Sequence, residues 1–569
     1  MVELYGRVDG GKAYDRLLTL LDRYGDKYST NWPSGRATLT QRDAIMITYG
    51  DQLSEQGVKP LSTLSSFCEA YLKDLISGIH VLPFFPYSSD DGFAVMDYKS
   101  VDPKLGSWDD LSHLRKHFRL MFDLVLNHIS VKSQWFQAYL RAEPAYSKYF
   151  IEVERSQDLS TVVRPRALPL LTEFETSSGK KMIWTTFSRD QVDLNYHNPD
   201  VLLAMIDVIL FYAAQGAEFI RLDAIAYLWK EIGTPCIHLP QTHKVVQLIR
   251  AVLDSVCPHV SIITETNVPH KENLSYFGDG MNEARLVYNF ALPPLVLYTL
   301  QTGSAQKLTD WADGLELPST ETAFFNFLAS HDGIGLNPAR GILSEAEITA
   351  MVTRTVDNGS LVSYKQNADG SQSPYELNVS YFDALATSSD RQVTGQWVAR
   401  YMVSQAIMLA MQGVPGIYFH SLFGSRGWME GVQLTGRNRT INRQKLERLK
   451  LEQELQNRAS LRSQIFTRYS RMLAVRASSY AFHPSGRQHV LDCGDGVFGL
   501  VRISPDEREC VFCLHNVTNQ NQTVELEWEM EPRRSFNKYV DLLTNQSGPW
   551  SDHKTSILKP YQVEWLELI

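Results

Sequence analysis

The sequence predicts an α/β fold in which parallel strands and helices form a (β/α)₈ barrel, followed by a smaller β domain. Short apolar runs recur along the chain, helical stretches separate them, and from about residue 485 the pattern changes to closely spaced short strands. Parallel strands that are buried on both faces have continuous apolar sequences, which fits these runs. A length of 569 residues accommodates such a barrel with insertions and a further domain.

Eight apolar runs are the candidate barrel strands. They occupy residues 44–49, 78–85, 120–126, 219–226, 261–266, 286–290, 324–329 and 414–419. Helical stretches such as 201–215 and 243–255 lie between them. A single run is also compatible with a turn of buried helix, so the prediction rests on the number of runs and their alternation with helices.

The spacing of these runs predicts a barrel with two insertions over its mouth. Two stretches are too long for simple crossovers, and the second contains the polar tract DGSQSPYELN. The segments are 1–43 (helical extension), 44–128, 199–332 and 401–484 (barrel), 129–198 and 333–400 (insertions), and 485–569 (β-sandwich). The charged run 446–458 is typical of a solvated helix face.

Composition excludes several classes of protein. The net charge of −9 argues against a strongly basic nucleic-acid binder, and 44% hydrophobic with 21% charged residues is typical of a globular chain. The sequence shows no run that predicts a membrane span and no signal-peptide pattern, and its six cysteines lack disulfide or metal-ligand spacing. We therefore expect a cytoplasmic protein that binds neither nucleic acid nor membranes.

Polar side chains follow four of the candidate strands, where barrel enzymes place their active sites. The segments are DLVLNH (123–128), IRLDA (220–224), TETN (264–267) and ASHD (329–332). Asp223 and Glu265 are candidates for the carboxylate nucleophile and the acid/base of a retaining glycosidase, with Asp332 as a third carboxylate. Arg221 shares a strand face with Asp223 and favours its anion. A single carboxylate of this kind is more often part of a structural ion pair or a strand-end cap, so the prediction rests on the set.

These four segments, in this order, resemble the motifs of glycoside hydrolase family 13, the α-amylase family, and in particular its sucrose phosphorylase subfamily. Other segments share the resemblance: PFFPYSSDDGFAVMDY, GSWDDL, RPRALP, QVDLNY, GTPCIHLPQTH, ALPPLVL, SHDGIG and GRNRTINR. The resemblance extends from about residue 44 to residue 443.

The resemblance implies a role for each matching residue. Asp223 matches the nucleophile, Glu265 the acid/base and Asp332 the transition-state stabiliser. The residues that match the glucose-binding subsite are Asp90, Phe93, His128, Gln191, Arg221, His331 and Arg439. Arg166 and Tyr227 match residues that help to bind phosphate. The family implies inorganic phosphate as co-substrate, no metal or other cofactor, and a monomer or homodimer.

Two departures from the sucrose phosphorylase pattern lie on the acceptor side. The tract 373–376 reads SPYE where those enzymes carry Asp-Leu-Tyr-Gln, and Asn267 replaces a histidine two residues after the acid/base. Both departures argue against fructose and favour relatives that act on glucosylglycerol or glucosylglycerate. Tyr375 and Glu376 are therefore candidate acceptor-side residues.

Charge favours glycerol over glycerate as the acceptor. A glycerate carboxylate calls for a cation, and the acceptor loop offers Lys365 beside the neutral Asn367 and Gln372. Glu376 would repel an anion. We therefore expect a retaining phosphorylase that converts 2-O-α-glucosylglycerol and phosphate into α-glucose 1-phosphate and glycerol through a covalent glucosyl-enzyme.

Other functions stay open at this point. The alternatives are a glucosylglycerate or sucrose phosphorylase, and a hydrolase or transglucosidase with the same barrel and glucose subsite. A catalytically inactive barrel that serves as a binding subunit is a third class. Such subunits usually lack the catalytic carboxylates, whereas this chain has Asp223, Glu265 and Asp332.

Overall fold

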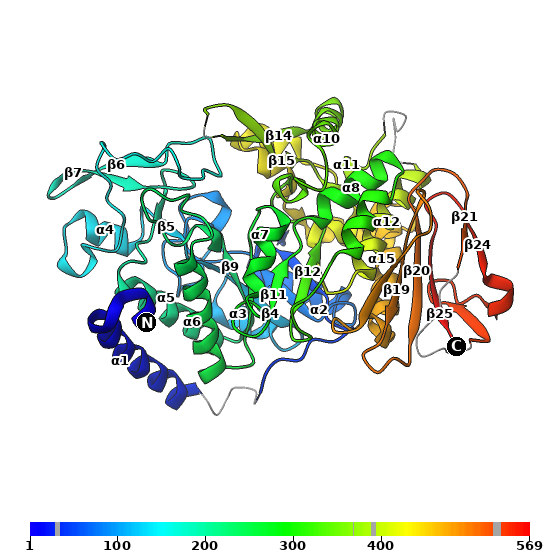
Figure 1. The fold of residues 1–569 in the computed structure, drawn as a ribbon, viewed down its shortest axis with the longest axis horizontal. Coiled ribbons are helices and arrows are strands. Elements are labelled where there is room, and N and C mark those ends of the chain that lie inside the picture. The colour runs from blue at the N-terminus through cyan, green and yellow to red at the C-terminus, as the bar shows by residue number, and fades with distance from the viewer. Residues whose placement is uncertain (29–34, 368, 388–393, 527–535) are drawn as a thin grey trace.

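The computed structural model describes residues 1–28, 35–367, 369–387, 394–526 and 536–569. Its centre is a closed parallel barrel, visible in the middle of Figure 1. The strands follow one another around the barrel in chain order: β1 (Ile45–Thr48), β3 (Gly78–Val81), β4 (Arg119–Val125), β9 (Ala217–Asp223), β10 (Ser261–Thr264), β11 (Leu286–Tyr288), β12 (Ala323–Phe327) and β16 (Val414–Tyr418). All eight predicted strands are present, so the predicted fold class is confirmed.

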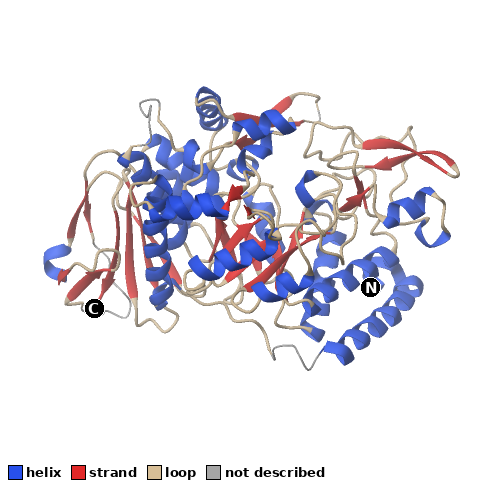
Figure 2. Cartoon of the chain, turned by 180° about the vertical axis from the view of Figure 1, so that it is seen from behind, coloured by secondary structure: helices blue, strands red, loops and turns tan. Residues whose placement is uncertain are grey.

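Helices cover the outside of the barrel, as the alternation of the sequence predicts. Figure 2 shows helices packed around the strands. They include α2 (Pro60–Tyr71), α3 (Trp108–Leu114), α5 (Pro199–Ala214), α6 (Pro240–Val256), α8 (Leu292–Thr302), α12 (Gly395–Ala410) and α15 (Leu461–Ser478). The barrel strands are buried on both faces, which explains their continuous apolar sequences.

Two inserted segments lie above the barrel, at the top of Figure 1. The first contains α4 (Gln134–Leu140), the hairpin of β6 (Leu171–Thr176) and β7 (Gly179–Trp184), and β8 (Gln191–Asp193), which pairs with β5 (His128–Ser130). The second contains β13 (Ile334–Gly335), α10 (Glu345–Asp357), β14 (Leu361–Gln366) and β15 (Gln372–Asn378), with β15 as the middle strand of a three-stranded sheet. Both therefore bring side chains to the carboxyl ends of the barrel strands.

A buried lysine joins the first insertion to the barrel. Lys230 Nζ lies 2.5 Å from Asn127 Oδ1 and 2.6 Å from Asp193 Oδ2, and all three side chains are buried. Asp193 accepts two further hydrogen bonds from Thr186. Because a buried ammonium needs an opposite charge and full hydrogen bonding, this contact fixes β8 beside the end of β4. The sequence analysis did not identify it.

Two further helices, α1 and α14, lie outside the barrel strands. Helix α1 (Val2–Tyr28) lies along α5 and α6, with an ion pair of 2.5 Å between Arg16 and Asp200. Helix α14 (Arg448–Gln456) corresponds to the charged run and buries Leu451. Among the described residues, no helix is long and apolar enough to cross a membrane.

The C-terminal part consists of β strands in two sheets. A six-stranded sheet has the order β18 (Arg487–Leu491), β19 (Val497–Ile503), β20 (Cys510–Asn516), β25 (Val563–Leu568), β22 (Lys538–Asp541) and β23 (Ser547–Pro549). The pair β21 (Gln522–Glu525) and β24 (Thr555–Leu558) packs against it through a separate apolar cluster. The closely spaced strands predicted from about residue 485 are present in the described part of this region, and residues 527–535 lie outside the described residues.

Candidate active site

A cavity opens at the carboxyl ends of the barrel strands. Every predicted site residue except Glu376 lines it: Asp90, Phe93, His128, Arg166, Gln191, Arg221, Asp223, Tyr227, Glu265, Asn267, His331, Asp332, Tyr375 and Arg439. Aromatic side chains that the sequence analysis did not name also line it: Phe187, Tyr288, Phe290 and Phe327. Within the described residues, no group of three or more His, Cys, Asp or Glu side chains is arranged to hold a metal ion.

Arg221 connects two carboxylates at the end of β9. Its Nη1 donates to Asp223 Oδ1 at 2.9 Å and also to the fully buried Asp123 on β4. His80 Nε2 lies 2.7 Å from Asp123 Oδ2. Burial alone would raise the pKa of Asp123, but Arg221 and His80 outweigh it and lower that pKa to about 2. The anionic Asp123 therefore holds Arg221 in place beneath Asp223.

Asp223 and Glu265 lie at the ends of the paired strands β9 and β10. The chain turns into a left-handed conformation at Ala224 (φ 52°), whose backbone N donates to Glu265 Oε2 at 3.1 Å. Burial raises the pKa of Glu265, and burial together with Glu265 raises the pKa of Asp223 against the effect of Arg221. Arg221 bonds Asp223 directly but lies 3.9 Å from Glu265. Arg221 therefore favours the anion at Asp223 more strongly than at Glu265.

Asp332 is held as an anion by two arginines. Its Oδ1 lies 2.6 Å from Arg439 Nη1 and 3.1 Å from Arg443 Nη2. Burial opposes the charge, but Arg439, His331 and Arg443 hold the pKa of Asp332 well below its usual range. Burial also lowers the pKa of His331 to about 3, so its imidazole is neutral at physiological pH. The His331 ring stacks on Phe93 with a centroid distance of 5.0 Å.

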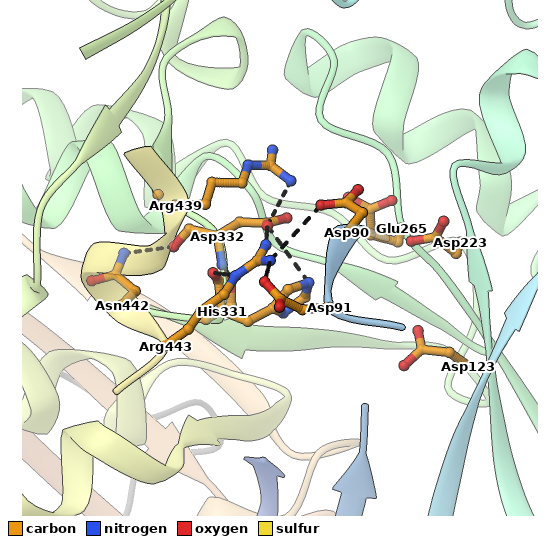
Figure 3. Close-up of polar contacts among 12 residues, drawn as sticks. Asp90, Asp91, Asp123, Asp223, Glu265, His331, Asp332, Arg439, Asn442 and Arg443 are labelled. Carbon is orange, nitrogen blue, oxygen red and sulfur yellow. Dashed lines mark hydrogen bonds and ion pairs between the residues drawn. The ribbon is translucent and has the colours of Figure 1, made fainter. Parts of the chain in front are cut away.

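Arg443 is a site residue that the sequence analysis missed. Figure 3 shows it reaching between Asp332 and Asp91; its Nε donates to the His331 carbonyl at 2.9 Å and its Nη1 to Asp91 Oδ2 at 2.5 Å. Asp90 and Asp91 both have left-handed backbone angles (φ 55° and 49°), a costly conformation that needs support. The available signal was the third arginine of GRNRTINR.

The first insertion contributes Gln191 to the same cluster. Its Nε2 donates to Asp90 Oδ2 at 3.3 Å and lies 3.1 Å from His128 Nε2. His128 Nε2 lies 3.0 Å from the Phe93 carbonyl oxygen. Burial lowers the pKa of His128, so this ring is also neutral. We call the residues that bond one another here the bonded cluster: Asp90, His128, Gln191, Arg221, Asp223, Glu265, Asp332, Arg439 and Arg443.

Four other residues that line the cavity differ from the bonded cluster in their hydrogen bonding. The side-chain polar groups of Arg166, Tyr227, Asn267 and Tyr375 make no hydrogen bond or ion pair within the part of the chain that the structure describes. Asn267 Oδ1 is buried without a partner. We call these four residues the unbonded cluster. Because buried polar groups are normally hydrogen-bonded, this end of the cavity is arranged for a polar ligand.

The expectation that Glu376 faces the acceptor and repels an anion is wrong. Its side chain is 1% exposed, and its Oε2 lies 2.6 Å from Arg439 Nη2. It also accepts hydrogen bonds from the Gly333 backbone N (3.1 Å) and from Asn378 Nδ2 (2.6 Å). Glu376 therefore lies behind Arg439, which neutralises its charge. Lys365 does not line the cavity either.

Comparisons with known proteins agree with this architecture. Residues 69–335 match the model described as alpha amylase, catalytic domain. The chain is 54% identical over 523 residues to a glucosylglycerate phosphorylase of Spirochaeta thermophila, covering 91% of this chain and 88% of the relative. It is 44% identical over 576 residues to a glucosylglycerate phosphorylase of Escherichia coli, covering 99% and 98%. The chain belongs to the α-amylase family.

Two relatives at lower identity are also phosphorylases. A glucosylglycerol phosphorylase of Marinobacter adhaerens is 27% identical to this α-amylase-family chain over 423 residues, covering 72% of this chain and 83% of the relative. Among solved structures, sucrose 6F-phosphate phosphorylase from Thermoanaerobacter thermosaccharolyticum superposes with a TM-score of 0.74 at 25% identity, covering 85% of this chain and 96% of that chain. The family resemblance that the sequence motifs carry is confirmed.

Proposed function

We propose that the protein is a retaining α-glucoside phosphorylase that converts 2-O-α-glucosylglycerate and phosphate into glycerate and α-glucose 1-phosphate. Two relatives at 54% and 44% identity are glucosylglycerate phosphorylases, whereas the glucosylglycerol phosphorylase is 27% identical. These comparisons favour glucosylglycerate, named above as an alternative, over glucosylglycerol.

One observation of the structure supports an anionic acceptor. The acidic side chain expected to repel a carboxylate, Glu376, is buried and paired with Arg439. Arg166 is left as a cation without a partner among the described residues of the cavity wall. The unbonded cluster is therefore net positive and suits glycerate better than glycerol.

The first half of the reaction forms the glucosyl-enzyme. In our proposal, the bonded cluster holds the glucosyl group while an Asp223 carboxylate oxygen attacks its C1 atom. The bond from C1 to the glycerate oxygen breaks, and that oxygen takes the electron pair and the proton of Glu265. The buried anion of Asp332 stabilises the positive charge that develops on the sugar ring.

The second half reverses these roles with phosphate as the acceptor. A phosphate oxygen attacks C1, the ester bond to Asp223 breaks, and its electron pair returns to the carboxylate. Glu265, now deprotonated, takes the proton of the attacking phosphate. Two inversions at C1 give α-glucose 1-phosphate with net retention. Phosphate is the co-substrate, and no step calls for a further cofactor.

The test is a comparison of substrates with the purified protein. We expect glucose 1-phosphate to form from 2-O-α-glucosylglycerate only when phosphate is present, with kcat/KM at least about tenfold above that for 2-O-α-glucosylglycerol or sucrose. A higher kcat/KM with glucosylglycerol would contradict the proposed acceptor. Release of free glucose at the same rate without phosphate would make the protein a hydrolase.

A further inference from the structure

We propose that Asp190 is a positioning residue for the glucosyl end of the cavity. Its carboxylate holds the turn of residues 88–93, which presents Asp90 and Phe93 to the cavity. The inference rests on the proposed function, in which the bonded cluster holds the glucosyl group. It adds a residue that does not itself line the cavity.

Three consecutive residues of this turn have positive φ angles. They are Asp90 (φ 55°), Asp91 (φ 49°) and Gly92 (φ 113°). Gly92 leaves no room for a side chain, because a Cβ atom there would lie 2.5 Å from the Pro83 carbonyl oxygen. A left-handed backbone costs free energy at residues that carry a Cβ atom, so the two aspartates keep it only if contacts outside the turn support it.

One carboxylate oxygen supplies such support at the start of the turn. Asp190 Oδ2 accepts a hydrogen bond from Ser88 Oγ at 2.5 Å and a second one from Ser89 Oγ. These two serines directly precede the strained residues. Ser130 Oγ lies 3.5 Å from Asp190 Oδ1 and 2.5 Å from Ser88 Oγ. Because hydrogen bonds to an ionised group are the stronger kind, loss of this carboxylate releases both serines at once.

Asp190 is itself fixed, so it can determine where the turn lies. Its carbonyl oxygen accepts a hydrogen bond from the Val131 backbone N at 3.1 Å. The next residue, Gln191, begins β8, which pairs with β5 at the end of the barrel strand β4. Arg443 holds the turn from the other side, through its contact with Asp91. The turn is therefore held at both ends, and Asp90 faces the cavity between them.

The experiment measures glucose binding, because glucose occupies the glucosyl end without an acceptor. The dissociation constant of D-glucose is determined by titration calorimetry for the wild type, Asp190→Ala, Asp190→Asn and the double variant Ser88→Ala/Ser89→Ala. We expect Asp190→Ala and the double variant each to weaken glucose binding by about tenfold. Combining all three substitutions should weaken it by less than about threefold more, because the carboxylate acts through the serines.

Asp190→Asn separates hydrogen bonding from charge. Its amide oxygen can still accept from both serines, so we expect glucose binding within about threefold of the wild type. An Asp190→Asn variant that binds glucose as weakly as Asp190→Ala would overturn the inference, because the negative charge would then be what matters. Tm is measured for each variant, since a merely structural role would change Tm and leave the glucose affinity of the folded protein unchanged.

Asp158→Ala is the matched control. Asp158 belongs to the same insertion, is exposed and accepts a hydrogen bond from the Ser160 backbone N at 2.9 Å, so we expect unchanged glucose binding. Wild-type affinity in a folded Asp190→Ala variant would also overturn the inference, and if that variant does not fold, the serine double variant decides in the same way. A protein with these glucose affinities that fails the substrate comparison would contradict the proposed function alone, so the two failures are distinguishable.

Discussion

The two ends of the cavity differ in how their polar groups are bonded. In the bonded cluster, each arginine has a carboxylate partner: Arg221 with Asp223, Arg439 with Asp332, and Arg443 with Asp91. In the unbonded cluster, Arg166 and its neighbours have no partner among the described residues. One end is therefore preorganised, and the other is open to a ligand.

This difference corresponds to the two tasks of a double displacement. The glucosyl group stays in place through both half-reactions, so its subsite benefits from fixed, mutually bonded side chains. The acceptor side must exchange one anion for another in each cycle. Donors that no protein group occupies serve this exchange because neither ligand has to displace an internal hydrogen bond.

The largest effect is expected at the centre of the bonded cluster. Asp223→Asn removes the proposed nucleophile, and we predict that turnover falls by roughly 10⁴-fold or more, measured as phosphate-dependent formation of glucose 1-phosphate. Asp74→Asn, at an exposed position of the barrel layer, should retain wild-type turnover. A folded Asp223→Asn variant with a near-normal rate would contradict the assignment.

Arg443 tests whether the bonded cluster depends on its supporting residue. Arg443→Gln removes the ion pair of Asp91 and leaves Asp332 with one of its two arginines, so we predict a loss of roughly 1–3 kcal/mol in the free energy of unfolding. We also predict that kcat falls when it is expressed per folded molecule, because Asp332 loses one of the two arginines that hold its position. Arg443→Lys should recover stability more than kcat. Arg458→Gln, at an exposed position, is the control. An unchanged kcat in Arg443→Gln would mean that Arg443 does not support the catalytic residues.

The variant Glu376→Gln tests whether Glu376 repels the acceptor or supports Arg439. If its charge repelled the acceptor, Glu376→Gln would increase kcat/KM for glucosylglycerate. We predict the opposite, a decrease of roughly tenfold, because Gln has no charge and only one acceptor oxygen, so Arg439 keeps at most one of its two contacts, at 2.6 and 3.1 Å. The exposed variant Glu430→Gln should have no effect in the same kinetic assay.

The smallest effect concerns pH and Glu265. Since burial raises its folded pKa above the unfolded value, the folded state binds this proton more tightly. That stabilisation is fully present below the unfolded pKa and is lost as pH rises through the folded pKa. We therefore predict that Glu265→Gln raises Tm by roughly 1–3 °C at pH 7 and by less at pH 4.5. The same difference at both pH values would contradict a buried, protonated Glu265, and Glu316→Gln is an exposed control.

The sequence predicts the barrel and the residues that line the site better than it predicts the long-range contacts that position those residues. Strand-end residues such as Asp223 and Glu265 are predictable because parallel strands end at one edge. The position of Glu376 was not, because its burial depends on a contact with Arg439, 63 residues away in the chain. Arg443 and Lys230 were missed for the same reason, since a local pattern does not show whether a basic side chain is buried against a distant acid.

The most direct test of the comparison between the two ends is the initial-rate pattern of the wild type. Rates of glucose 1-phosphate formation are measured against 2-O-α-glucosylglycerate at several fixed phosphate concentrations. If one glucosyl group stays bound while two anions use the same end in turn, double-reciprocal plots give parallel lines. Intersecting lines would mean that glucosylglycerate and phosphate bind together, and would contradict this division of the cavity.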